Sequence, residues 1–281
     1  MGHSEPMYPV PVLTYHALNI SGNDYANNDH VAFASDLEMV TALGWRIAPL
    51  RLVVDAYLGS APALGDKTLA VTFDDATDFD FHDLPHPTAG QQRSMLNIMR
   101  DFVAAHPGAQ PGLHATSFAI ASPDARAAMD RICILGRSWM NDAWWPEAVA
   151  TGLIGIANHS WDHNHEAVER VAQRNQEKGN FFCIDNENDA NAQIRQSARF
   201  IEARAPSPAV SLFGYPYGHV NEFLSRDYLP RQAASNAPFV NAAFGTAAGK
   251  IHAGSDRWNL PRYVCGWHWK SSEDLGQLLR D

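Results

Sequence analysis

The sequence has few basic residues and no long apolar segment. Its 281 residues carry 21 Lys and Arg against 31 Asp and Glu, a formal net charge of −10 with neutral histidine. That sign is wrong for attracting nucleic acid or an anionic membrane surface. No apolar run approaches the roughly 18–20 residues that cross a bilayer, so we expect no transmembrane segment. With 46% hydrophobic and only 19% charged residues, the composition excludes an intrinsically disordered chain.

Cysteine is also scarce. Cys133, Cys183 and Cys265 are too few and too scattered for a disulfide framework, and none belongs to a CxxC pair that could bind zinc. We therefore expect buried free thiols. The chain opens without the charged and apolar regions of a secretion signal, which indicates a cytoplasmic protein. The opening residues 1–3 (Met-Gly-His) resemble an expression tag, however, so an exported protein whose signal has been removed is the alternative.

No internal repeat, low-complexity tract or Pro/Gly/Ser-rich linker is present, so we expect a single domain over residues 1–281. Short apolar runs alternate with segments of helical periodicity, which is typical of βα units around a parallel sheet. Strands are expected at 10–15, 45–48, 68–73, 115–120, 153–157 and 210–213, and more weakly at 239–244 and 258–260. Helical stripes are expected at 33–44, 96–103 and 190–201, and long loops at 78–90 and 172–188.

Ionisable and aromatic residues follow four of the expected strands. They are Tyr15 and His16, then Asp74 and Asp75, then Asn158 and His159, and finally Tyr215 to Gly218. In a closed parallel sheet the carboxyl ends of the strands meet at one face, where the active sites of (β/α) barrels lie. We therefore expect these residues to share one pocket.

Asp74 and Asp75 could have two different catalytic roles. One carboxylate can bind a cation while its neighbour, pointing another way, transfers protons. A lone Asp-Asp pair is more often a turn with a capping aspartate, so this pair indicates little by itself.

His159 and His163 stand four residues apart, and on one face of a helical turn they could chelate one metal ion. The glutamate of the zinc-protease HExxH pattern is missing, because a serine takes its place, so the base must come from Asp74 or Asp75. One Asp and two His leave a coordination position for water, as in catalytic zinc sites. His165 is a second choice of ligand, because residues two apart on a helix face different ways.

Together these motifs resemble the polysaccharide deacetylases, carbohydrate esterase family 4. The resemblance rests on Thr-Phe-Asp-Asp at 72–75, His-Ser-x-x-His at 159–163 and Tyr-Pro-Tyr-Gly at 215–218, in that order. It implies an α/β fold, a distorted (β/α) barrel of about seven strands. It also implies an enzyme that removes N- or O-acetyl groups from sugar polymers with one divalent metal.

By this resemblance Asp74 is the catalytic base, and Asp75, His159 and His163 are the metal ligands. The backbone N–H of Tyr217 would help to hold the oxyanion that forms on attack. The expected cofactor is one divalent metal ion, with zinc preferred and cobalt or nickel as alternatives.

The sequence departs from the family pattern in three places. The first motif continues with Ala76 where the family has glycine, a change to which we assign no chemical penalty. Gly214 stands where the family has the arginine that pairs with the base, and we expect Arg262 to replace it and lie within ion-pair reach of Asp74. No Leu-x-His motif is evident near the C-terminus. The early Tyr-His is instead similar to deacetylases with circularly permuted motifs, which makes His16 the candidate general acid.

The function that these residues favour is metal-dependent hydrolysis of an N-acetyl amide, or less readily an O-acetyl ester, on a carbohydrate. Aromatic residues offer flat faces on which sugar rings stack: Trp144, Trp145, Trp161, Trp267 and Trp269. One alternative is a deacylase of the same chemistry that acts on a small amide such as a formamide or a cyclic ureide. The sugar and the oligomeric state are left open by the sequence.

Two alternatives from other classes also remain. A carbohydrate-binding relative without catalysis would keep the aromatic residues but lose the base or a ligand, whereas all four are present here. Non-haem Fe(II) oxygenases also use two His and one carboxylate. Their carboxylate normally lies within two residues of the first histidine and their folds are all-β, and this sequence shows neither feature.

Overall fold

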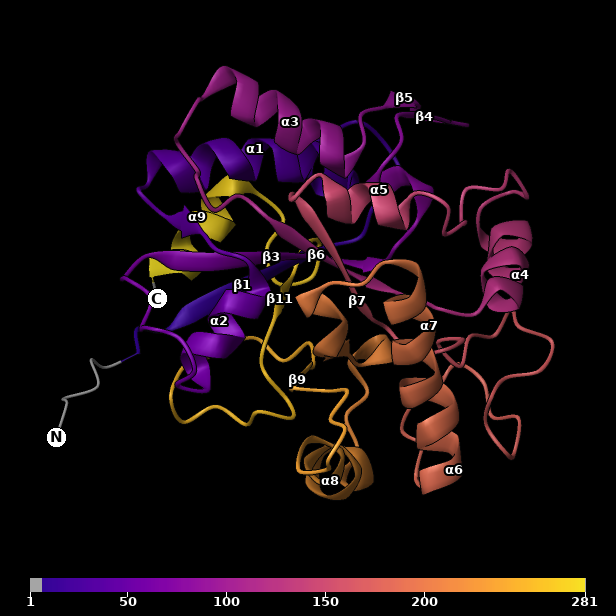
Figure 1. Cartoon of the computed structure of the whole chain (residues 1–281). Coiled ribbons are helices and arrows are strands. Elements are labelled where there is room, and N and C mark those ends of the chain that lie inside the picture. The colour runs from indigo at the N-terminus through magenta and orange to yellow at the C-terminus, as the bar shows by residue number, and fades with distance from the viewer. Residues whose placement is uncertain (1–6, 281) are drawn as a thin grey trace, which may run out of the picture.

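The computed structural model describes residues 7–280 and is built around a nine-stranded sheet (Figure 1). Residues 1–6, which include the expected tag, and residue 281 lie outside the described part. The strands of this sheet are β1 (Val10–Tyr15), β2 (Arg46–Ile47), β3 (Thr68–Asp75), β6 (Ala115–Ala119), β7 (Ile154–Asn158), β8 (Leu212–Gly214), β9 (Ala242–Phe244), β10 (Lys250–Ile251) and β11 (Tyr263–Val264). A separate hairpin joins β4 (Leu84–His86) to β5 (Gly90–Gln92).

The strands lie in the order β10-β1-β3-β6-β7-β8-β9, with β2 beside β3 and β11 beside β1. Every pairing in this sheet is parallel except that of β10 with β1. Residues 260–264 connect the two sides of the curled sheet, because Leu260 bridges Phe244 of β9 while β11 pairs with β1. The result is the predicted α/β architecture, a distorted (β/α) barrel with about seven parallel strands.

Helices cover the outside of the sheet (Figure 1). They are α1 (Asp29–Ala42), α2 (Leu50–Tyr57), α3 (Met95–Ala105), α4 (Pro123–Cys133), α5 (Trp145–Ala150), α6 (Glu187–Ala190), α7 (Gln196–Arg204), α8 (Leu229–Ala233) and α9 (Ser272–Arg280). A π-helical turn at Asn191–Arg195 joins α6 to α7. Helix α1 packs against α3 and α9, α2 against β3, and both α5 and α7 against β7.

Short polar side chains cap the N-termini of four of these helices, α1, α3, α4 and α6. Asn28 accepts a hydrogen bond from the backbone of His30 at the start of α1, and Ser94 does the same for Asn97 in α3. Such caps satisfy N–H groups that have no partner within the helix. Gly44 follows α1 with a φ of 78°, a left-handed conformation that glycine adopts without strain.

The side chains of β3 alternate between two environments. Leu69, Val71 and Phe73 pack in the cluster shared with the covering helices, whereas Ala70 belongs to the cluster inside the barrel. Because successive strand residues point to opposite faces, Asp74 falls on the interior side. The strand pattern therefore aims one of the two adjacent carboxylates into the barrel.

Most predicted strands are confirmed within one or two residues, and the three helical stripes correspond to α1, α3 and the α6–α7 segment, with Gly44 two residues beyond the end of α1. The weak candidate at 258–260 contributes a single bridge at Leu260, and the paired strand follows at Tyr263. In residues 7–280, no helix has the length and apolar character needed to span a bilayer.

The expectation of buried thiols is wrong for two of the three cysteines. Cys133 is exposed and Cys183 is partly exposed, whereas Cys265 is buried and none is in a disulfide. Cys133 is the last residue of α4, where its side chain turns to solvent at the end of the helix.

Candidate active site

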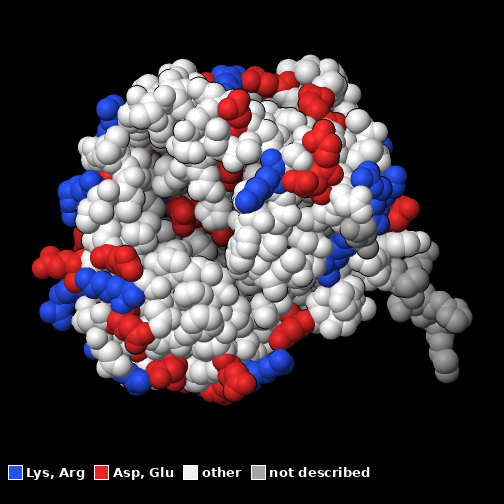
Figure 2. Space-filling model, turned by 180° about the vertical axis from the view of Figure 1, so that it is seen from behind, with Lys and Arg blue, Asp and Glu red and all other residues white. Residues whose placement is uncertain are grey.

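The ends of four strands meet around a cavity of about 330 Å³. Its lining comprises His16 after β1, Asp74 and Asp75 at the end of β3, His159, His163 and His165 after β7, and Tyr217 and Gly218 after β8, together with Met129, Thr246, Val264 and Trp267. Figure 2 shows one face of the molecule, in which acidic side chains lie deep in a central hollow with mostly uncharged residues around it. The expected convergence at the carboxyl ends of the strands is therefore present.

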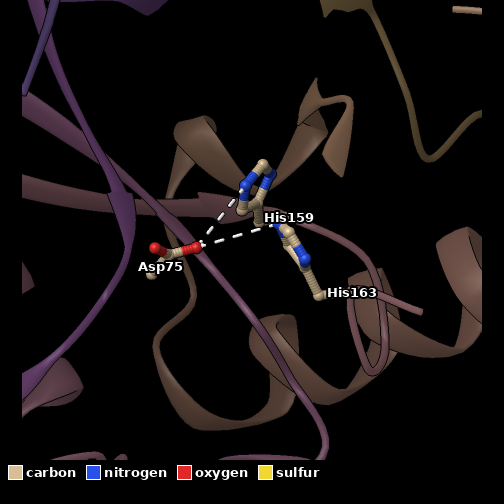
Figure 3. A group of neighbouring side chains, drawn as sticks. All are labelled: Asp75, His159 and His163. Atoms are coloured by element: carbon tan, nitrogen blue, oxygen red, sulfur yellow. Dashed lines mark ion pairs between the residues drawn. The ribbon is translucent and has the colours of Figure 1, made fainter. Parts of the chain in front are cut away.

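Asp75, His159 and His163 form a compact group of three ligand-type side chains (Figure 3). The Oδ1 atom of Asp75 lies 3.8 Å from Nε2 of His159 and 3.9 Å from Nε2 of His163. Ligand atoms about 2.0–2.2 Å from a tetrahedral zinc ion lie roughly 3.3–3.6 Å apart. The observed separations exceed that range by only a few tenths of an ångström.

The donor atoms of this group suit a divalent metal. Nδ1 of His159 donates to the carbonyl of Gly214 at 2.8 Å, which leaves the lone pair of Nε2 directed to the Asp75 side. Burial, with the neighbouring His159 and His165, holds the pKa of His163 well below its usual range, so its imidazole is neutral. Two imidazoles and a carboxylate are ligands that zinc accepts, and they leave a coordination position free.

The two histidines do not lie on a helical turn, and that prediction is wrong. Residues 159–164 form an irregular loop in which Ser160 and His163 have φ angles of 71° and 60°. Side chains within the loop compete with helix formation, because Asn158 accepts from the backbone of Ser160 and Ser160 accepts from that of His163. The two Nε2 atoms converge through this turn and not through helical spacing.

The Asp75 turn has a conformation that most residues avoid. Asp75 and Ala76 have φ angles of 75° and 53°, so the chain leaves the strand alternation and brings the carboxylate of Asp75 to the histidines. Such left-handed residues cost roughly 1–2 kcal/mol each when they are not glycine. Ala76 therefore carries a conformational cost that a glycine would avoid, whereas no penalty was expected from the sequence.

Arg126 supports this turn, and its role was not predicted from the sequence. Its buried guanidinium donates to the carbonyls of Ala76, Ile120, Met140 and Asn141, and it stacks over the ring of Trp145. One side chain thus ties the end of β3 to the end of β6 and to the segment before α5. An arginine in a helical segment resembles any surface arginine, so no sequence signal distinguishes it.

Asp74 is held by Arg262. Nη1 and Nη2 of Arg262 donate to Oδ1 and Oδ2 of Asp74 at 2.7 and 3.0 Å, and both residues are buried. Burial is the largest single effect and would raise the pKa of Asp74, but the charge and hydrogen bonds of Arg262, together with smaller effects of His159 and His16, hold the pKa well below its usual range. The expected contact between these two residues is present, and it keeps the carboxylate ionised.

A side chain at Gly214 would be crowded. A Cβ atom at this position would lie 3.1 Å from the ring of Phe118 and 3.2 Å from Nδ1 of His159. The guanidinium that contacts Asp74 comes instead from Arg262, and it lies 5.0 Å from the centre of the same Phe118 ring.

His16, which follows β1, also lies close to Asp74. Its Nε2 atom is 3.9 Å from Oδ2 of Asp74, and its side chain is partly exposed to the cavity. The backbone N–H of His16 donates to the buried carboxylate of Asp29 at 2.7 Å, which anchors the residue. A side chain that borders both the cavity and the base is placed to exchange a proton with a bound molecule.

Tyr217 stands over His163 with its ring centre 4.3 Å from that of the imidazole. Its φ of 58° is left-handed, and the next residue, Gly218, is left-handed too. This turn places Tyr217 on the wall of the cavity.

Most of the tryptophans expected to stack on sugars are in the core. Trp144, Trp145 and Trp269 are buried and Trp161 is packed against the main hydrophobic cluster, whereas Trp267 is 65% exposed and lines the cavity. The large apolar surface of these rings explains why most of them are buried.

Comparison with known proteins gives structural matches only. No protein-family model matches the sequence, and no curated protein matches it. Among solved structures, the deacetylase PplD of Streptococcus pyogenes in complex with acetate matches with a TM-score of 0.62 at 15% identity, over 98% of this chain and 99% of that chain. IcaB of Ammonifex degensii gives 0.64 at 17% identity, over 97% of each chain. A polysaccharide deacetylase of Bacillus cereus gives 0.61 at 15% identity, over 97% of this chain and 69% of that one.

These alignments extend over nearly the whole chain, while the identities are low. The protein therefore has the fold of known polysaccharide deacetylases, the group that its motifs resemble.

Proposed function

We propose that the protein is a metal-dependent hydrolase that removes N-acetyl groups from a carbohydrate. The observation that carries the proposal is the pairing, within one cavity, of the Asp75–His159–His163 group with an ionised Asp74. The similar folds of solved deacetylases support the same function.

Asp75, His159 and His163 would hold the metal, with zinc as the first choice and cobalt or nickel as alternatives. The chemistry that a divalent cation supplies in such a site is polarisation of the acetyl carbonyl and a lower pKa for water. Imidazole nitrogens with one carboxylate suit these three metals better than magnesium or calcium, which prefer oxygen ligands.

Asp74 is the base in this proposal. It is ionised because Arg262 holds both of its oxygens, and it borders the cavity beside the metal ligands. Its Oδ2 atom lies 3.9 Å from Nε2 of both His16 and His159, so a water molecule between these groups could give it a proton.

His16 is the general acid. An amine is a poor leaving group and departs only when its nitrogen is protonated, and Nε2 of His16 is near the base and on the cavity wall. The backbone N–H of Tyr217 would donate to the oxygen that becomes negative on attack. Trp267 offers the sugar ring an exposed aromatic face at the mouth of the cavity.

Acetate release tests the proposal. The protein would be incubated with acetylated glycans and with small amides, after chelation and after addition of Zn²⁺ or Co²⁺. Release of acetate from glycans that depends on added metal is the expected result. Hydrolysis of small amides alone would assign the site to another substrate class, and equal rates after chelation would contradict a metal enzyme.

A further inference from the structure

An uninterrupted series of rings leads out of the cavity. The ring of His163 is followed by that of Tyr217 at 4.3 Å, then by His219 at 5.3 Å from Tyr217, and then by Phe182 at 4.2 Å from His219. The last two rings are stacked, with an angle of 15° between their planes. The series begins at a metal-ligand candidate and ends at a side chain that is 51% exposed.

Exposed Phe, Tyr and Trp side chains are few among the described residues. Besides Phe182 they are Tyr8, Tyr217 and Trp267, and two of these three line the cavity. Exposed apolar surface costs free energy in a protein without a partner, and its concentration beside a pocket is typical of a binding surface. Phe182 extends such a surface beyond the cavity itself.

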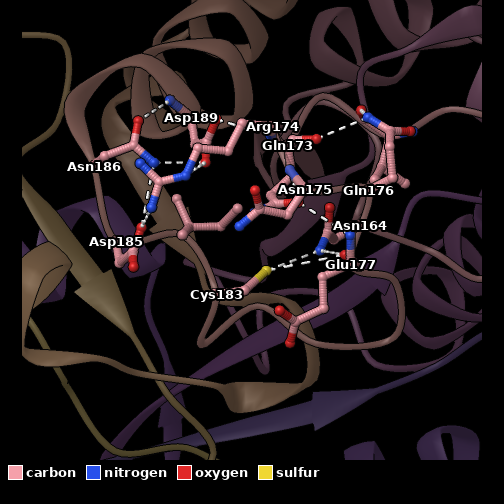
Figure 4. Close-up of polar contacts among 12 residues, drawn as sticks. Asn164, Gln173, Arg174, Asn175, Gln176, Glu177, Cys183, Asp185, Asn186 and Asp189 are labelled. Carbon is pink, nitrogen blue, oxygen red and sulfur yellow. Dashed lines mark hydrogen bonds and ion pairs between the residues drawn. The ribbon is translucent and has the colours of Figure 1, made fainter.

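Phe182 belongs to the long loop between β7 and α6, and that loop is held by its own polar side chains (Figure 4). Asn164 donates to the carbonyls of Glu177 and Asn180, and Arg174 pairs with Asp185. These bonds order a segment that has no helix or strand of its own.

The backbone around Phe182 is anchored as well. Its carbonyl accepts from the side chain of Asn221 at 3.0 Å, and its N–H donates to Asn180. Nδ1 of His219 accepts from the N–H of Phe181, which fixes the imidazole on which Phe182 stacks. The exposed ring is thus presented in one orientation, and little conformational entropy remains to be lost when a ligand binds.

We propose that Phe182, stacked on His219, is a second sugar-binding subsite that takes a neighbouring unit of the glycan whose reacting unit lies in the cavity. The proposal rests on the function proposed above. A pyranose presents an apolar C–H face, which packs on one side of an aromatic ring while the other side of that ring rests on its support. Continuity of the rings from Tyr217 to Phe182 favours a chain of sugars over a small amide.

The test compares Phe182→Ala with Phe182→Tyr, which keeps the ring. The matched control is Tyr8→Ala, because Tyr8 is also 51% exposed and does not line the cavity. Acetate release is measured on N-acetylglucosamine and on its oligomers of two to six units in β-1,3, β-1,4 and β-1,6 linkage. Binding of the same oligomers is measured by calorimetry.

For Phe182→Ala we expect KM for the longer oligomers to rise roughly three- to tenfold, as expected when one aromatic contact is lost. The values of kcat, and KM for the single sugar, should stay within twofold of wild type. Phe182→Tyr should have the wild-type KM for the oligomers, and Tyr8→Ala should leave kcat and KM unchanged for every substrate. An equal effect on single sugar and oligomer, or no effect on any length, would overturn the subsite.

The two proposals fail in different ways. If the wild-type protein binds oligomers in the calorimeter, and binds them less tightly with Phe182→Ala, but releases no acetate, the proposed activity is wrong and the subsite stands. If acetate is released and neither KM nor affinity depends on Phe182, the activity stands and the subsite is wrong.

Discussion

Inside the barrel, Arg262 donates two hydrogen bonds to the carboxylate of Asp74. They run from Nη1 to Oδ1 at 2.7 Å and from Nη2 to Oδ2 at 3.0 Å. The two residues are 188 positions apart in the chain. Without this partner the pKa of the buried carboxylate would rise, because burial disfavours its charged form.

Arg262→Met tests this dependence. Without the guanidinium, burial dominates and the pKa of Asp74 rises, so the acid limb of the pH–rate profile should move to higher pH. The free energy of unfolding should fall by about 3–5 kcal/mol, as for other buried ion pairs that lose one partner. An acid limb at the wild-type position would show that another group keeps Asp74 ionised.

Asp75→Ala and His163→Ala test the metal site. Each removes one of three ligands, so metal content after dialysis, measured by mass spectrometry, should fall together with activity. His165→Ala is the control, because His165 lines the same cavity but does not belong to the three-residue group. Full metal content in both ligand variants would refute the assignment.

Asp74→Asn separates the base from the ligands. The amide keeps the shape of the side chain but takes up no proton, so kcat should fall by about 10²–10⁴ while metal content is unchanged. Loss of metal in this variant would mean that the roles of Asp74 and Asp75 are reversed.

His16→Ala distinguishes a general acid from a structural histidine. Hydrolysis of an acetamide needs a proton on the departing nitrogen, whereas an activated aryl acetate has a leaving group that departs as an anion. The rate on the amide should therefore fall far more than the rate on the aryl ester, with metal content unchanged. Equal losses on both substrates, together with a lower melting temperature, would indicate a structural role.

We predict that the free energy of unfolding depends on pH through Asp36. Its buried carboxyl accepts hydrogen bonds from Tyr15, Tyr25 and Trp269, yet burial raises its pKa from 3.8 to about 6. Between these values the folded state binds more protons than the unfolded state, so this group contributes stability below about pH 4 that is lost as the pH rises through 6.

Asp36→Asn should remove that contribution, which is about 3 kcal/mol for a shift of roughly two pKa units. Denaturant unfolding at a series of pH values from 4 to 7 measures it. The wild-type protein should lose more stability than the variant over this range. Parallel curves for the two proteins would show that Asp36 has an ordinary pKa in the folded state.

The barrel and four of its strand ends were predictable because local patterns carry that information. Apolar runs of strand length alternate with helical stripes, and the chemistry-bearing residues directly follow the strands. Asp74 and Asp75 are adjacent, so the alternation of a strand, with the left-handed turn at Asp75, explains why their carboxylates point in different directions.

Three features of the structure could not be predicted from local sequence patterns. The turn at residues 159–163 is irregular because Asn158 and Ser160 bond to nearby backbone groups, and a spacing of four residues does not reveal such competition. Burial of most tryptophans depends on how loops and helix ends pack on the sheet, because Trp145 begins α5 whereas Trp144, Trp161 and Trp269 lie outside helices. Arg126 reaches four carbonyls that come from separate segments of the chain.

The sequence by itself determined the residue types of the site, their order, and the strands that they follow, because all of these depend on neighbours in the chain. Only the tertiary structure decided that Arg262, the partner that the motif comparison suggests for Asp74, holds both carboxylate oxygens, that a Cβ at Gly214 would crowd His159, and that Phe182 stacks on His219. Each of these contacts joins segments that are distant in the chain. Their distances depend on how the sheet curls, which no local pattern encodes.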